Sequence, residues 1–148
     1  MRDFGPPVLI ALDPDESHAK YVGRTFDGRQ FFVATHADPQ CLIHGHVFVA
    51  VYLFNSAGKL LEARIDDLGT DSKVNAMVWA NAAEQRYREL GWTYIQRIAM
   101  QPFHVERFGL AFGLIAFQRD KSDDWMAEIR PGNPMAFFPP WDSGLYDT

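Results

Sequence analysis

The chain has 148 residues and a formal net charge of −5, with 47% apolar and 22% charged residues, a composition typical of a globular protein, so disorder is not expected over most of the chain. An acidic chain without a basic patch suits nucleic acid poorly, so no nucleic-acid partner is expected. No apolar run reaches the roughly 18 residues of a membrane-spanning helix, so no membrane partner is expected either. The single cysteine, Cys41, excludes an internal disulfide. Because residues 1–7 also lack the pattern of a signal peptide, we expect a cytoplasmic protein.

The first third of the chain predicts an arm followed by short strands. Asp27-Gly28 is a dipeptide typical of tight hairpin turns, so the strands on either side of it should pair. The expected segments are a loose arm at 1–7, a short strand at 8–12, a hairpin of 19–26 with 30–35, and an irregular loop at 36–45.

A second hairpin at residues 47–67 forms the centre of the predicted fold. Residues 47–54 are apolar on both faces, which is typical of a central strand covered on both sides. Residues 61–66 alternate between apolar and charged, which is typical of a strand with one wet face. Gly58 supplies the left-handed backbone that the connecting turn needs.

A helix is predicted after this hairpin. Thr70, Asp71 and Ser72 offer oxygens for its N-terminal cap, and Gly91 follows the expected last residue, Leu90. Small and apolar residues recur at spacings of four and three along one face, namely Ala76, Ala80, Ala83, Tyr87 and Leu90.

The last third predicts three strands, at 92–101, 110–118 and 125–130, and then a proline-rich aromatic segment at 131–148. Because its first part, 131–141, is apolar but too rich in proline for a central strand, we expect it to cover Phe48 and Tyr52. The sequence therefore predicts one α+β domain over residues 1–148. Its mostly antiparallel sheet should carry a long helix on one face and residues 131–148 on the other.

The end of the chain contains the residues that we single out as candidates for binding a partner. Chain ends are usually polar and frayed, whereas this one keeps large aromatic groups beside aspartates. One interpretation is that Trp141 and Tyr146 dock on the domain as a lid. The other is a contact surface for another protein, since Trp and Tyr anchor many interfaces. The candidates are Trp125, Trp141, Asp142, Tyr146 and Asp147.

A cluster of zinc-ligand residue types is the main alternative site. It comprises His36, Cys41, His44 and His46. Their spacing follows no established zinc pattern, so we expect no cofactor and keep zinc as the alternative. His104 beside Glu106 is a second candidate for acid–base chemistry, in a stretch that we expect to be a connection between strands.

Several stretches form a recognisable set, namely residues 21–24, 27–32, 52–54 with Gly58, 102–106 with 112–114, 123–125, 140–142 and 146–148. In these stretches the chain resembles a group of small bacterial proteins, some of which are labelled formate hydrogenlyase regulatory proteins. The resemblance implies regulation through contact with another protein and implies no catalytic residues. We therefore expect a non-catalytic binding or regulatory protein, whose contact can also be with a second copy as a homodimer. The alternatives are a toxin-immunity protein, by analogy of fold class, and a small zinc enzyme or binder.

Overall fold

The structure is a computed structural model that describes residues 5–38, 45–118, 120 and 124–148. Its elements are β1 (Ile10–Leu12), β2 (Val22–Thr25), β3 (Gln30–Ala37), β4 (His46–Phe54), β5 (Leu60–Thr70), α1 (Ala76–Arg88), β6 (Thr93–Ile95), β7 (Ile98–Met100), β8 (Phe103–Arg107), β9 (Leu110–Gln118), β10 (Trp125–Arg130) and β11 (Ala136–Phe137). All paired strands are antiparallel, which confirms the predicted α+β fold with a mostly antiparallel sheet and one helix. Within the described residues, no helix has the length and apolarity needed to cross a membrane.

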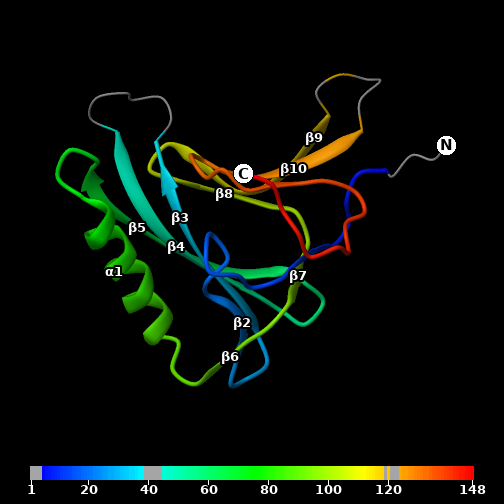
Figure 1. The fold of residues 1–148 in the computed structure, drawn as a ribbon, viewed down its shortest axis with the longest axis horizontal. Coiled ribbons are helices and arrows are strands. Elements are labelled where there is room, and N and C mark those ends of the chain that lie inside the picture. The colour runs from blue at the N-terminus through cyan, green and yellow to red at the C-terminus, as the bar shows by residue number, and fades with distance from the viewer. Residues whose placement is uncertain (1–4, 39–44, 119, 121–123) are drawn as a thin grey trace.

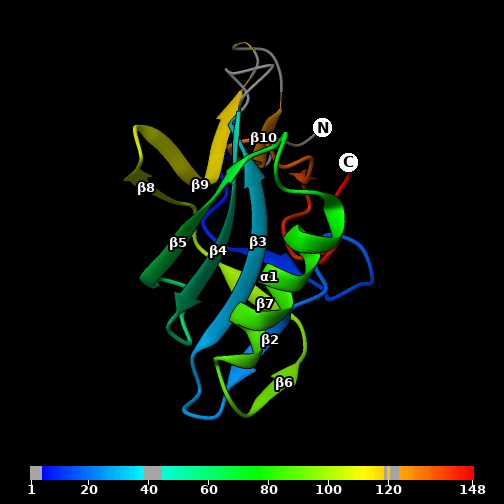
Figure 2. The same ribbon diagram turned by 90° about the vertical axis from the view of Figure 1, so that its left-hand side faces the viewer.

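The strands of the described residues form three sheets, whose arrangement can be followed in Figure 1. The first has five strands in the order β5-β4-β3-β2-β6, the second has four in the order β11-β10-β9-β8, and β1 pairs with β7 alone. The helix α1 lies against the outer side of the five-stranded sheet, next to β3 and β4 (Figure 2). The two smaller sheets lie on the other side of the five-stranded sheet, so the main core is enclosed between sheets (Figure 1).

The central hairpin is formed by β4 and β5, as the sequence predicts. Every residue of β4 after its first is buried, which agrees with a strand that is apolar on both faces. In the turn, the side-chain oxygen of Asn55 accepts hydrogen bonds from the backbone N–H groups of Ala57 and Lys59, at 3.0 and 2.9 Å. Gly58 has φ +90°, a conformation that residues with a Cβ rarely adopt.

The helix begins later than the sequence predicts. β5 continues through Thr70, so residues 70–72 cannot start a helix, and the expectation that they form the cap is wrong. Asn75 forms the cap instead, because its side-chain oxygen accepts a hydrogen bond of 2.9 Å from the N–H of Val78. The first turn of the helix is therefore fixed by an asparagine that lies inside the range predicted to be helical.

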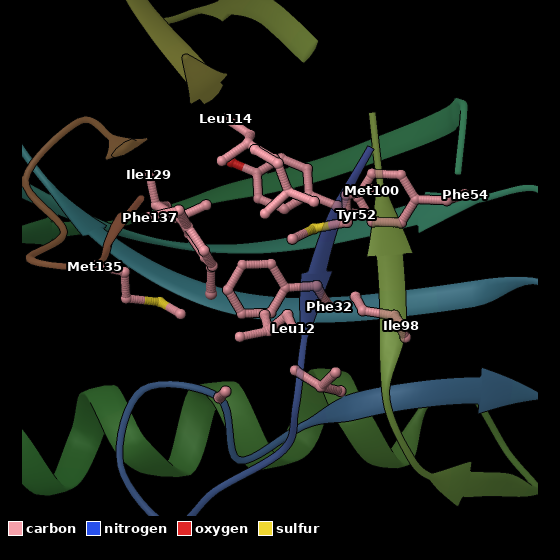
Figure 3. Close-up of a cluster of buried hydrophobic side chains, with 14 of the residues drawn as sticks. Leu12, Phe32, Tyr52, Phe54, Ile98, Met100, Leu114, Ile129, Met135 and Phe137 are labelled. Atoms are coloured by element: carbon pink, nitrogen blue, oxygen red, sulfur yellow. The ribbon is translucent and has the colours of Figure 1, made fainter. Parts of the chain in front are cut away.

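Two apolar clusters lie on the two faces of the five-stranded sheet. On the helix side, Ala83 is buried against side chains of β3 and β4, and Tyr87 and Leu90 pack around it. Trp79 adds a polar contact, since its indole N–H donates to the carbonyl of Phe48 at 3.0 Å. The larger cluster lies on the opposite face and combines side chains from all three sheets (Figure 3); its labelled members are Leu12, Phe32, Tyr52, Phe54, Ile98, Met100, Leu114, Ile129, Met135 and Phe137.

The segment 92–101 differs from the single strand that the sequence predicts. It forms β6 at the edge of the five-stranded sheet and then β7, which pairs with β1 in another sheet. The N–H of Gln96 still bonds to the carbonyl of Val22 at 3.1 Å, whereas the Arg97 side chain bonds to Asp13 outside that sheet. The break falls where the chain leaves one partner strand for another, and apolar alternation alone does not mark such a change of partner.

Two further strands, β8 and β11, lie in segments that the sequence does not predict as strands. β8 supplies Phe103, whose ring contacts Tyr52 with a centroid distance of 4.8 Å. The turn after it supplies Phe108, which stacks on Phe48 at 5.5 Å. The rings that contact Phe48 and Tyr52 therefore include two from the β8–β9 hairpin, Phe108 and Phe103. The sequence does not predict that this hairpin covers them.

Candidate functional site

The C-terminal segment (residues 131–148) is bonded to the domain along its length. The N–H of Ala11 donates to the carbonyl of Trp141, and the N–H of Asp13 donates to the carbonyl of Gly144, both at 2.9 Å. Ala136 and Asp147 exchange two backbone hydrogen bonds of 2.8 Å. The end of the chain is thus an ordered part of the fold, lying beside β1 and β11.

Trp141 and Tyr146 direct their rings inward. Both are half-buried and pack against the main core cluster. The indole N–H of Trp141 is buried and has no hydrogen-bond partner among the described residues, so its ring contributes apolar packing. The Tyr146 hydroxyl donates to a carboxylate oxygen of Asp15 at 2.5 Å and accepts from the N–H of His18 at 3.1 Å.

This contact perturbs the titration of both side chains. Burial, together with the hydrogen bond to Asp15, raises the pKa of Tyr146. Partial desolvation acts to raise the pKa of Asp15, but hydrogen bonds from Tyr146, Ser17 and Ala19 outweigh it and hold that pKa below its ordinary value. At neutral pH Tyr146 therefore keeps its proton and Asp15 stays ionised. The hydrogen bond between them is maintained and connects the C-terminal segment with the residues that follow β1.

Arg97 holds the next part of the C-terminal segment. Its guanidinium makes two hydrogen bonds to Asp13, at 2.6 and 3.0 Å, and donates to the carbonyls of Asp142 and Ser143 at 3.1 and 3.2 Å. The hydrogen bond from Arg97 lowers the pKa of Asp13. One arginine thus connects the turn after β1 with residues 142–143, and the Asp142 side chain remains exposed.

The outward side of the C-terminal segment forms a shallow groove of about 260 Å³. Its lining residues are Phe138, Pro139, Pro140, Ser143, Leu145, Tyr146 and Asp147. Leu145 is 70% exposed and Phe138 is 40% exposed, so two large apolar side chains face solvent here. Exposed carboxylates accompany them, from Asp147 in the lining and from Asp142 next to Ser143. We call this set of residues, with Asp142, the C-terminal groove.

Four of the five predicted partner-binding residues therefore lie in one ordered segment, and they play different parts. Trp141 and Tyr146 point largely into the domain, whereas Asp142 and Asp147 are exposed. Trp125 is half-buried and is the first residue of β10, two residues before Ala127, which pairs with Phe137. The groove lining begins at Phe138, so Trp125 lies near the groove. Two groove residues, Phe138 and Leu145, are not among the residues predicted from the sequence. The sequence feature that could have indicated them is an apolar residue placed between prolines, as Phe138 is, or beside a glycine, as Leu145 is. Such residues cannot join a regular core strand.

The predicted metal ligands do not all fall within the described residues. Cys41 and His44 lie outside them. His36 is buried in β3, with Nδ1 at 2.9 Å from the Pro131 carbonyl and Nε2 at 2.8 Å from the Tyr52 hydroxyl. His46 is exposed and pairs with Asp67 at 2.8 Å. Among the described residues, no group of three or more His, Cys, Asp and Glu side chains is placed to hold a metal ion.

His36 connects the sheets through a buried hydrogen-bond chain, Tyr52–His36–Pro131. Burial lowers the pKa of His36 to about 4, although its bond to the Pro131 carbonyl acts in the opposite direction. Burial also raises the pKa of Tyr52. A neutral His36 must donate from Nδ1, because a carbonyl only accepts, and its Nε2 then accepts from Tyr52. This geometry describes a core histidine with both ring nitrogens hydrogen-bonded.

Two further groups of titratable side chains lie in β8 and beside α1. His104 and Glu106 lie in β8, with 3.5 Å between Nε2 and the carboxylate, and both side chains are more than half exposed. A hollow of about 180 Å³ beside α1 has Lys20 and His18 in its lining, above Val33 and Ala83. This hollow is smaller than the roughly 300–1,000 Å³ of most small-molecule sites. Neither place joins a paired acid and base to a deep cavity.

Comparisons with models of known protein families, with curated proteins and with solved structures give no match.

Proposed function

We propose that this protein is a non-catalytic binding or regulatory protein that acts by contact with another protein, through the C-terminal groove. The observation that carries the proposal is the pair of exposed apolar side chains, Phe138 and Leu145, on a segment fixed by backbone hydrogen bonds. An ordered apolar surface loses little conformational entropy on binding, which favours affinity. Exposed apolar groups with a polar rim are typical of protein contact sites.

In this proposal the C-terminal segment has two roles. Its inward side chains, including Met135, Phe137 and Trp141, complete the core on the face of the five-stranded sheet opposite α1. Its outward side chains, Phe138 and Leu145, form the contact surface. The inward packing supports the outward function, because it fixes the positions of the groove residues before a partner arrives.

The charge of the groove predicts the chemistry of the partner. Asp142 and Asp147 place two exposed carboxylates at the groove, in a chain whose net charge is −5. A complementary partner presents an apolar side chain that fits beside Leu145, flanked by Lys or Arg. Neither nucleic acid nor a membrane surface offers that combination, so we propose a cytoplasmic protein as the partner. The regulatory role implied by the resemblance noted above agrees with this proposal.

Substitution in the groove tests the proposal. Leu145→Lys should abolish recovery of the partner from extracts of the source cells, because it places a cation where an apolar contact is expected and opposes the partner's basic groups. Met77→Lys is the matched control, since Met77 is 72% exposed and lies on α1, away from the groove. Both variants should unfold at the same urea concentration as the parent chain. Equal recovery with Leu145→Lys and with the parent would overturn the assignment of the groove.

A further inference from the structure

A second exposed apolar surface lies at the far edge of the five-stranded sheet. Trp92, Tyr94 and Ile95 are 69%, 56% and 47% exposed, and Phe26 is 80% exposed. The register places them together, because Thr25 pairs with Thr93 and Arg24 pairs with Tyr94. Phe26 and Trp92 are the next positions along the two strands. Figures 1 and 2 show β6 as the outermost strand at this end of the molecule.

The outer edge of β6 carries backbone groups that point away from the sheet. The N–H of Gln96 bonds to the Val22 carbonyl, so Gln96 and Tyr94 direct their backbone groups toward β2. Backbone direction alternates along an antiparallel strand, so Thr93 and Ile95 direct theirs outward. The described part of the sheet has no further strand on that side.

The composition of β6 leaves this edge open to pairing. Natural edge strands are protected by being very short or by charged residues, prolines or bulges; β6 is short, with three residues, but Thr93-Tyr94-Ile95 contains no proline or charge. The opposite edge of the same sheet shows the contrast. That edge is β5, which carries Glu62, Arg64, Asp66 and Asp67 and has irregular register with β4. One edge of the sheet is thus protected by charge and the other is not.

We propose that β6 pairs with β6 of a second copy of this chain, antiparallel, about a two-fold axis at Tyr94. Thr93 then lies opposite Ile95 of the second copy, and the reverse pair follows by symmetry, which gives four backbone hydrogen bonds. Tyr94 lies opposite Tyr94 of the second copy, in a non-hydrogen-bonded pair with its Cα atoms about 4.5 Å apart. The two five-stranded sheets become one sheet of ten strands.

A second copy fits this edge because the edge is self-complementary. Thr93 and Ile95, whose backbone groups point outward, are placed symmetrically about Tyr94. A two-fold rotation about Tyr94 therefore brings each outward N–H of one copy opposite an outward carbonyl of the other. The side chains also match: Trp92 and Tyr94 share one face of the sheet, while Thr93 lies on the other face and donates from its hydroxyl to Tyr87 at 2.8 Å. In the dimer, the aromatic side chains of both copies form one continuous row.

The exposed area indicates a weak dimer. Three aromatic side chains of roughly 200 Å² each, exposed by 56–80%, supply at most about 400 Å² per chain, and Phe26, which lies on the β2 side of β6, is covered only in part. With Ile95 and the backbone, the total for both chains is at most about 1,000 Å², the size of weak and transient contacts. We therefore expect dissociation in the micromolar range of chain concentration.

Analytical ultracentrifugation over a series of concentrations tests the dimer. The parent chain should move from 16.9 kDa toward twice that mass as concentration rises. Tyr94→Lys places two like charges across the axis and should raise the dissociation constant about tenfold or more. Leu61→Lys is the matched control, since Leu61 is 53% exposed on the opposite edge strand, and it should dimerise like the parent chain. A parent chain that stays monomeric up to several hundred micromolar overturns the proposal, as does an unchanged dissociation constant in Tyr94→Lys.

A mixing experiment tests the axis itself. At a chain concentration near the dissociation constant of the parent chain, Tyr94→Lys and Tyr94→Glu should each be mostly monomeric alone and should dimerise when mixed, because opposite charges then meet across the axis. A folded mixture that stays monomeric overturns the two-fold geometry. Tyr94→Cys in a Cys41→Ser background gives a second readout, since opposed Cα atoms about 4.5 Å apart suit a disulfide. Oxidation should convert this variant to a covalent dimer, and failure to cross-link at concentrations where the parent chain is dimeric also overturns the pairing.

Discussion

The buried histidine in the Tyr52–His36–Pro131 chain predicts a specific loss of stability in mild acid. His36 is fully buried, and burial lowers its pKa to about 4 from the ordinary value of 6.5. In the unfolded chain the same imidazole titrates at its ordinary value. Between these two pKa values the unfolded state holds one proton that the folded state does not, so lowering the pH favours unfolding.

The magnitude follows from this difference in proton binding. The contribution of neutral His36 is fully present above the unfolded pKa of 6.5 and is lost as pH falls toward the folded value of about 4. One proton per molecule corresponds to about 1.4 kcal/mol of unfolding free energy per pH unit, so moving from about pH 7.5 to pH 5 should cost roughly 2 kcal/mol. The carboxyl groups of Asp13, Asp15 and Asp67 have lowered pKa values, so their contributions are lost at still lower pH.

Urea unfolding at several pH values measures this effect. The parent chain should lose the stated free energy between about pH 7.5 and pH 5, and His36→Gln, which has no titrating group at that position, should lose about 2 kcal/mol less over the same interval. The quantity compared is the change in unfolding free energy between the two pH values. A destabilisation of His36→Gln that is the same at every pH therefore does not affect the comparison. Equal losses of unfolding free energy in the two proteins over this interval would show that His36 is not the group that takes up the proton.

Three substitutions test other parts of the structure by urea unfolding at neutral pH. Tyr52→Phe should cost about 1–3 kcal/mol, because it leaves Nε2 of His36 buried without a donor; no loss would show that the hydroxyl is not needed there. Gly58→Ala should destabilise by about 1 kcal/mol or more, because φ is +90° and the new Cβ would lie 2.6 Å from the carbonyl oxygen of Ala99. Gly28→Ala is its matched control, with the same φ of +90° and open space around the new Cβ, so it should cost less. Equal losses for the two alanines would contradict the close approach at Gly58.

Patterns among neighbouring residues are sufficient to predict most of the hairpins from the sequence. The alternation of residues 61–66 and the two-sided apolar pattern of β4 depend only on neighbouring positions, and both strands form as predicted. The bounds of β9 and β10 also agree with the prediction, because the strongly polar residues between them mark the connection. These elements are specified by residues within a few positions of each other.

Elements that depend on distant partners could not be predicted in this way. The break between β6 and β7 depends on β1, which lies more than eighty residues earlier in the chain and offers Ile98 and Met100 a second partner strand. β8 follows Pro102 and is only partly buried, so it has neither a long apolar run nor a strict alternation. Asn75 becomes the helix cap because β5 runs further than its sequence pattern shows.

The candidate site was only partly predictable for a related reason. Large aromatic residues near the chain end mark Trp141 and Tyr146 as important, but sequence alone does not distinguish a ring that packs inward from one that is presented. The hydrogen bonds from Ala11 and Asp13 fix that orientation, and both come from the other end of the chain. The exposed position of Leu145 follows from this docking.

Site-specific photo-cross-linking in the source cells tests the proposed contact most directly. A photoreactive phenylalanine analogue at position 145 should give a covalent adduct with one other protein, because Leu145 lies in the C-terminal groove. The same analogue at position 77, which is equally exposed on α1, should give none. A chain that forms no adduct from position 145, or the same adducts from both positions, would contradict the account.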